Sequence, residues 1–181
     1  CHSPLTVRHS NLRGLHWQEG PWQVHAGYSF FGTFEHLLLA AEREQVAGVS
    51  YRQRLNSSSA LTSNLYYYRS SSATKADGVM STVVFETKPK AGIEALAEVG
   101  VGGGTGAAAV DFKVFRPNLS VWTTARFAPD TLPSLSNDQP SGRQIEAGLV
   151  RQAGDWRIDA TANCASWTKS TMSGGTCSAS I

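Results

Sequence analysis

The sequence predicts an all-β protein whose strands form an antiparallel up-and-down meander. The main observation is an alternation of residue character between residues 78 and 127. Successive side chains of a strand point to opposite faces, so a repeat of two residues marks a strand with one apolar face. The repeat is clearest over residues 93–101, 108–115 and 119–127, where every second residue is apolar or threonine.

The turns give an independent test of this reading. Pro117-Asn118 and Gly103-Gly104 are typical of two-residue hairpin loops. Cross-strand partners share a face, and a slip of one residue would move every side chain to the other face. The predicted partners are Val114 with Val121, Phe112 with Thr123, Val110 with Ala125, Ala108 with Phe127, Val99 with Ala108, Ala97 with Val110 and Ala95 with Phe112. The apolar rows then join into one continuous face, with a charged face behind it.

The same reasoning predicts further strands over 22–30, 46–55, 61–67, 79–87, 144–152 and 156–163. Gly154-Asp155 is expected to be another two-residue loop, which pairs Leu149 with Ala160 and Ala147 with Ala162. Lys88-Pro89-Lys90 is predicted to be a tight turn, and residues 128–142 a loop. Residues 33–44 fit either a short helix or an irregular, bulged strand.

The length of 181 residues suits a single domain over residues 1–181. Residues 1–20 and 168–181 are expected to be peripheral or loop. The net charge is only +2 and the basic residues are scattered, which argues against a nucleic-acid partner. No apolar run approaches the roughly 18 residues of a membrane-spanning helix.

Motifs for catalysis and metal binding are weak. The sequence has no Gly-x-Ser-x-Gly elbow, and the glycine-rich segment 100–106 lacks the Lys-Ser/Thr of a phosphate-binding loop. We therefore expect no enzyme activity and no cofactor. His2, His9 and His16 lack the close spacing of metal ligands, so no metal site is expected.

The cysteines leave two alternatives open. Cys164 and Cys177 either form a disulfide that closes a small loop or remain two free thiols. Their spacing alone does not decide between these, because a disulfide depends on the geometry of the two backbones.

Alternation alone fits two architectures. A soluble lipocalin-like β-barrel or a β-sandwich would turn the apolar face inward, onto a core or an apolar ligand. A transmembrane β-barrel, or part of one, would turn the same face outward to lipid.

Four observations favour the membrane. The strands are about 9 to 11 residues long, which suits a tilted crossing, whereas soluble strands average about 5–6. The apolar rows consist largely of Ala, Val, Leu and Thr, which lipid accommodates better than a packed core does. Tight and longer connections alternate. Aromatic residues gather near strand ends, as in interfacial girdles: Trp22, Tyr28, Phe30, Tyr66 to Tyr68, Phe127, Trp156 and Trp167.

By this pattern the chain from Trp22 to Trp167 resembles a bacterial outer-membrane β-barrel of porin-like type. The resemblance implies the outer membrane of a Gram-negative-type bacterium, membrane lipid and small solutes as partners, and a role as a passive pore or a surface structural barrel. The chain does not open with a signal peptide and does not finish on an aromatic residue, so a fragment of a larger barrel is expected. The oligomeric state stays open.

The two faces receive separate assignments. The polar face is predicted to line a pore, or alternatively to fill a narrow barrel with paired charges. The pore-lining candidates are Arg52, Arg54, Glu86, Glu94, Glu98, Asp111, Lys113, Arg126, Glu146, Arg157 and Asp159. The candidates for contact with lipid are Ala95, Val110, Phe112, Val121, Leu149 and Ile158.

Overall fold

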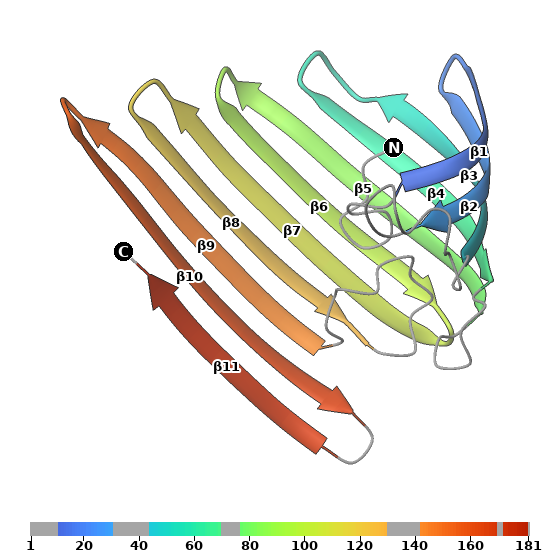
Figure 1. Ribbon diagram of the computed structural model, residues 1–181. Helices are drawn as coiled ribbons and strands as arrows, with labels where there is room; N and C mark the ends of the chain where they lie inside the picture. The colour runs from blue at the N-terminus through green and yellow to red at the C-terminus, as the bar shows by residue number, and fades with distance from the viewer. Residues whose placement is uncertain (1–10, 31–43, 70–76, 130–141, 170–171, 181) are drawn as a thin grey trace.

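The computed structural model describes residues 11–30, 44–69, 77–129, 142–169 and 172–180. These residues form eleven strands in one sheet, ordered from β1 to β11 along the chain (Figure 1). The strands are β1 (Asn11–Glu19), β2 (Trp22–Phe30), β3 (Glu44–Arg54), β4 (Ser59–Arg69), β5 (Gly78–Lys90), β6 (Ile93–Gly102), β7 (Thr105–Arg116), β8 (Leu119–Ala128), β9 (Gly142–Ala153), β10 (Trp156–Lys169) and β11 (Met172–Ser180). The predicted all-β antiparallel meander is confirmed. No helix long and apolar enough to cross a membrane occurs in the described part of the chain.

The predicted registers are also confirmed. The hairpins through Gly103-Gly104, Pro117-Asn118 and Gly154-Asp155 pair every residue as expected. Gly103 and Gly154 adopt positive φ angles of 58° and 60°, which favour glycine over residues with a side chain. The alternation and the turn chemistry therefore specify the same pairing.

The turn predicted at Lys88-Pro89-Lys90 is wrong. These residues belong to β5, where the register with β6 shifts between Thr87 and Lys90. Such a bulge tolerates proline, which has no N–H for the ladder. The chain turns instead at Ala91-Gly92, because Gly92 takes a φ of 74° that suits a glycine.

The terminal segments contain the two edge strands. Residues 1–20 and 168–181 were expected to be peripheral or loop, and the structure forms β1 and β11 within them. These two strands are the edges of the sheet, since each is paired with one neighbour among the described strands. Strand β11 is rich in Ser and Gly, which do not favour strands, and it forms nevertheless because it pairs with β10. The predictions for residues 33–43 and 130–141 lie outside the described residues.

One end of the sheet, here called the tight-turn end, carries the turns at residues 20–21, 55–58, 91–92, 117–118 and 154–155. It lies at the top of Figure 1. Four of these turns are tied to the next strand by a backbone hydrogen bond, accepted by Pro21, Ser58, Gly92 and Asn118 from the N–H of Arg52, Lys88, Phe115 and Gln152. The tight-turn end is therefore a continuous hydrogen-bonded rim.

The sheet twists and curls, so that β1 to β3 turn out of the plane of β6 to β10 (Figure 1). All described strands belong to this single layer, and only side chains on the concave side of a curled layer converge on one another. The concave face therefore holds the largest fully buried side chains, which are Tyr66, Met80, Glu98, Val84, Thr82 and Ser50.

The convex face carries the exposed apolar residues. By register, all of the exposed large hydrophobic residues except Leu55 and Phe115 lie on it. The convex face thus departs from the usual distribution of a soluble protein, which keeps large apolar residues inside, while the concave face mixes buried apolar side chains with buried polar ones.

Candidate functional site: the charged concave face

The concave face collects the predicted charged residues from seven strands, β3 and β5 to β10. All eleven pore-lining candidates occupy this face by register, and all six candidates for lipid contact occupy the convex face. The period-2 pattern therefore sorted both sets correctly between the two faces. Their roles in a pore or at lipid remain predictions.

The register arranges the charges in neighbouring rows across the strands. One row runs through Arg52, Thr62, Val84, Glu98, Ala109, Arg126 and Gln144. The next row towards the tight-turn end runs through Arg54, Ala60, Glu86, Leu96, Asp111, Thr124, Glu146 and Asn163. Paired strands lie about 4.8 Å apart, so long side chains from different strands reach one another along and between the rows.

Ion pairs fix several of these charges. Arg52 Nη2 lies 2.7 Å from Glu86 Oε2, Lys88 Nζ lies 2.6 Å from Glu94 Oε1, and Arg157 Nε lies 2.9 Å from Asp159 Oδ2. All six side chains are partly exposed, so each pair contributes only about 0–1 kcal/mol to stability. Their main effect is to fix where positive and negative charge sits on the concave face.

A second group of concave side chains packs tightly in the middle of β2 to β5. Asn64 Nδ2 donates a hydrogen bond of 2.9 Å to Thr82 Oγ1, and the ring of Tyr66 lies 5.2 Å from that of His25. Gly48 pairs with Tyr66 across β3 and β4, and a Cβ at Gly48 would overlap the Tyr66 ring. Here the concave face is filled by its own side chains.

The tyrosines correct one sequence prediction. Tyr66 to Tyr68 were assigned together to an aromatic girdle, but Tyr66 and Tyr68 are buried on the concave face. Only Tyr67 lies exposed on the convex face, because consecutive strand residues point to opposite faces. The side chains of Phe30 and Trp167 lie outside the described ones.

Most of the remaining convex aromatics form two groups at opposite ends of the strands, and Phe85 and Phe112 lie within the strands on the same face. The tight-turn end has Trp17, Trp22, Tyr51 and Trp156, and the other end has Tyr28, Tyr67 and Phe127. Trp22 and Tyr51 pair across β2 and β3 with ring centroids 4.7 Å apart. Aliphatic residues lie between the groups, among them Val24, Leu65, Val83, Val99, Val110, Ile145 and Ile158.

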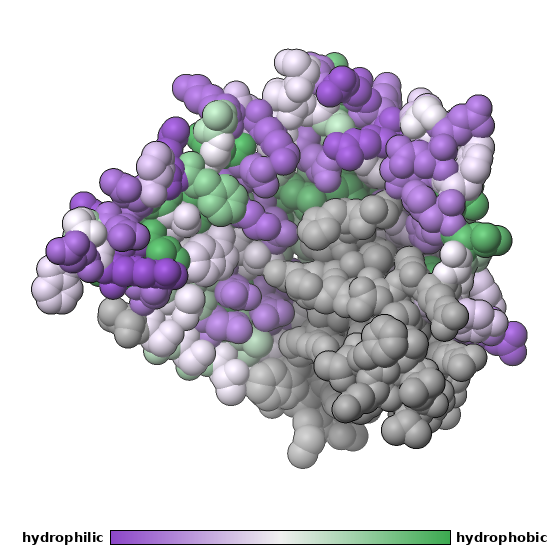
Figure 2. Space-filling view, turned by 45° about the horizontal axis from the view of Figure 1, so that its top comes forward, coloured by the Kyte–Doolittle hydropathy of each residue, from purple (hydrophilic) through white to green (hydrophobic). Residues whose placement is uncertain are grey.

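A hollow of about 560 Å³ opens on the concave side at the tight-turn end. It is lined by Gln18, Gly20, Pro21, Gln23, Arg52, Arg54, Asn56, Ser57, Ser58, Ser59, Ala60, Glu86 and Lys88. A smaller hollow of about 180 Å³ adjoins it, where Glu86, Lys88, Glu94, Asp111 and Lys113 meet. Hydrophilic residues dominate this end of the molecule (Figure 2).

Sequence reasoning missed several residues of this face. Lys88 was assigned to a turn, so its place beside Glu94 was not foreseen. Gln18 and Gln23 are direct cross-strand partners on β1 and β2, and a two-residue loop at Gly20-Pro21 would have revealed this pair. His25, Asn64 and Thr82 occupy the strand positions between residues of the convex face. Their place in the two-residue repeat could therefore have assigned them to the concave face.

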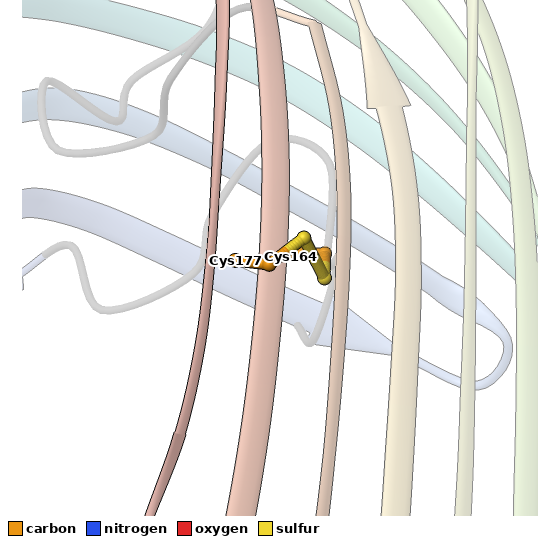
Figure 3. The surroundings of a disulfide bond; sticks show 2 residues. All are labelled: Cys164 and Cys177. Atoms are coloured by element: carbon orange, nitrogen blue, oxygen red, sulfur yellow. A yellow bond between two sulfur atoms is a disulfide. The ribbon is translucent and has the colours of Figure 1, made fainter.

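The cysteines form a disulfide. Cys164 of β10 and Cys177 of β11 are direct cross-strand partners and are bonded to each other (Figure 3). Cys164 also pairs with Ile145, an exposed residue of the convex face, so the bridge lies on that face. It ties the edge strand β11 to the rest of the sheet and decides between the two alternatives left by the sequence.

Among the described residues, no group of three or more His, Cys, Asp or Glu side chains is placed to hold a metal ion. Comparison of the chain with protein-family models, curated proteins and solved structures finds no match.

Proposed function

We propose that this chain forms the wall of a transmembrane β-barrel, or part of one, in the outer membrane of a Gram-negative-type bacterium, and that it serves as a passive pore for small hydrophilic solutes. The observation that carries the proposal is the contrast between the two faces. Large apolar residues are exposed across the convex side, while charged and polar residues are buried on the concave side together with apolar ones such as Tyr66 and Met80.

Water is a poor solvent for such a convex face. Monomeric soluble proteins rarely expose continuous apolar patches larger than a few hundred Å². Each large apolar side chain gains roughly 1.5–3 kcal/mol when it moves completely from water into an apolar phase. A bilayer provides that phase for every strand at once.

The dimensions and the aromatic residues fit a bilayer. The strands have 9 to 14 residues, and a transmembrane β-strand needs about 9–11 residues at a tilt of about 45°. The two groups of convex aromatics, with mainly aliphatic residues between them, match the girdles at the two membrane interfaces. Trp22 and Tyr28 mark these two levels within the single strand β2.

A bilayer also requires that the edges of the sheet be paired, because lipid cannot satisfy free backbone N–H and C=O groups. In an antiparallel meander β1 and β11 run in the same direction. They can therefore close on each other only as a parallel pair, whereas fully antiparallel closure needs an odd number of additional strands. The proposal requires one of these two arrangements in the membrane.

The disulfide supports a location in the cell envelope. Disulfides persist in oxidising compartments such as the bacterial periplasm and cell surface, and they are rare in the cytosol. The Cys164–Cys177 bridge is exposed, so a reducing compartment would have access to it.

The soluble alternative is less well supported. A lipocalin-like barrel that binds an apolar ligand needs an apolar interior. The concave face instead carries Glu98 and Arg126, both buried, and two hollows with charged walls. An apolar ligand on this side would have to displace water from charged groups, which is costly.

The proposal is tested by the gel mobility of the expressed chain in detergent, with and without boiling. A closed barrel resists detergent because all its backbone groups are paired, so its mobility should change only after heating. A protein that stays soluble without detergent and shows no shift with heating would contradict the proposal.

A further inference from the structure

We infer that the hollow at the tight-turn end is a binding site for a small hydrophilic anion that carries a carboxylate or phosphate group, with Arg54 as its principal contact. As a step in transport this inference rests on the proposed function. As a binding site it can be tested on its own.

The charge of the hollow favours an anion. Three cationic side chains, Arg52, Arg54 and Lys88, line it together with a single carboxylate, that of Glu86. Arg52 is paired with Glu86, and Lys88 is paired with Glu94 just outside the lining. Among the cations of this lining within the described part of the chain, Arg54 is the one without an ion pair, so its guanidinium is the best placed of the three to contact a ligand.

The chemistry of the remaining wall favours a ligand with several hydroxyl groups. Amide side chains of Gln18, Gln23 and Asn56 and hydroxyls of three serines line the hollow, and no described residue of its lining is aromatic or a large aliphatic. Its volume of about 560 Å³ falls within the roughly 300–1,000 Å³ of small-molecule sites. An acidic sugar satisfies both the charge and the hydrogen-bonding groups.

The walls are fixed before any ligand binds. Arg52 N–H donates to Pro21 O and Lys88 N–H donates to Ser58 O, both at 2.8 Å, which ties together the tips of the first two tight turns and β5. Asn56 Oδ1 accepts from the Ser58 N–H at 2.8 Å and from Ser58 Oγ at 3.0 Å, which holds the turn between β3 and β4. A preorganised wall loses little entropy on binding, which favours affinity.

Arginine suits this task better than lysine. Its planar guanidinium donates two parallel hydrogen bonds to a carboxylate or phosphate, and such charge-assisted bonds are about twice as strong as neutral ones. Arg54 lies next to the turn at residues 55–58, so an incoming solute meets it at the rim of the sheet.

The test is a calorimetric titration of the full chain in detergent with glucuronate, glucose 6-phosphate and neutral glucose. Saturable binding of at least one anion is expected, with glucose weaker by roughly tenfold or more, as for the loss of one charge-assisted hydrogen bond. The stronger of the two anions identifies the carboxylate or the phosphate as the preferred group.

Variants locate the site. Arg54→Gln should weaken anion binding by roughly tenfold or more, and Arg54→Lys should weaken it less because the charge remains. Arg151→Gln is the matched control, since Arg151 pairs with Leu119 and Ile158 on the convex face and lines neither hollow, and the affinity of this variant should equal that of the unaltered chain. Equal affinity for glucose and both anions, unchanged affinity in Arg54→Gln, or no saturable binding would overturn the inference.

The two proposals fail separately. Saturable anion binding without a heat-dependent gel shift would contradict the proposed membrane barrel and support the binding site. A heat-dependent shift without saturable binding would contradict the binding site and support the barrel. Circular dichroism of each variant confirms that the strands are retained.

Discussion

Gly148 of β9 lies directly opposite Trp122 of β8 on the concave face, and a Cβ at Gly148 would overlap the indole ring. The same arrangement recurs at Gly48 and Tyr66, which pair across β3 and β4. An aromatic ring that lies over a glycine covers backbone which the glycine itself leaves open, and it helps to fix the strand register. These two glycines therefore serve packing between neighbouring strands.

Replacement of Gly148 by alanine should destabilise the sheet. The added methyl group forces the Trp122 ring out of place, and such overpacking costs about 1–3 kcal/mol. Denaturant unfolding followed by tryptophan fluorescence measures the loss. Gly106→Ala is the control, because the nearest atom to a Cβ there is Gly100 O at 3.8 Å, and an equal loss in both variants would contradict the packing explanation.

Two phenylalanines of β7 test the orientation of the faces. Phe112 is 39% exposed on the convex face, and Phe115 is 47% exposed on the concave side near the tight-turn end. Phe112→Lys should impair assembly into lipid vesicles by about 2–4 kcal/mol if position 112 lies near the bilayer midplane. Phe115→Lys should assemble like the unaltered chain, even though the Phe115 side chain is slightly more exposed than that of Phe112. Equal assembly of both variants, measured by the fraction that becomes heat-modifiable, would show that the convex face does not contact lipid.

Loss of the disulfide should loosen the edge strand. Strand β11 pairs only with β10, and the Cys164–Cys177 bridge spans 13 residues of sequence. Loss of a disulfide that closes a loop of that size lowers the free energy of unfolding by about 3 kcal/mol in the chain-entropy model. In Cys164→Ser/Cys177→Ser the amides of residues 172–180 should exchange hydrogen faster, while those of β7 and β8 should not change. Unchanged exchange in β11 would mean that backbone pairing alone holds this strand.

The ion pairs on the concave face predict the sign of ion selectivity. Glu94 pairs with Lys88 at 2.6 Å, so Glu94→Gln releases a positive charge beside the hollows. The reversal potential under a salt gradient should therefore show greater anion selectivity than in the unaltered chain. In Lys88→Gln it should show greater cation selectivity. Rings of charged side chains set ion preference in wide pores. A reversal potential that stays at the value of the unaltered chain in both variants would indicate that these residues do not line an open lumen.

The sequence was sufficient for most of the fold because its signals were local and mutually consistent. The alternation over residues 93–127 and the two-residue loops specified the same pairings, so each register could be checked before the structure was known. Prediction failed where the backbone departs from regular geometry. Pro89 indicated a turn, but it lies at the bulge of β5, and the turn falls at Gly92.

The candidate site was less accessible to prediction because it combines distant strands. Period-2 parity placed Arg52, Arg54 and Glu86 on one face. It did not show that Arg52 reaches Glu86 over an intervening strand, since this depends on the curl of the sheet and on side-chain rotamers. Strand β11 was missed because its Ser and Gly residues carry no strand pattern, and the disulfide that holds it could not be inferred from spacing.

The most direct test of the central claim is a spin-label scan of β7 over residues 107 to 114 in lipid vesicles, with Cys1 replaced by serine so that only the introduced cysteine reacts. If the convex face contacts lipid, labels at 108, 110, 112 and 114 should be accessible to oxygen, which dissolves in lipid, and protected from a water-soluble nickel chelate. Labels at 107, 109, 111 and 113 should show lower oxygen access. Free access of the nickel chelate to positions 110 and 112 would contradict the membrane assignment, because these side chains would then face water.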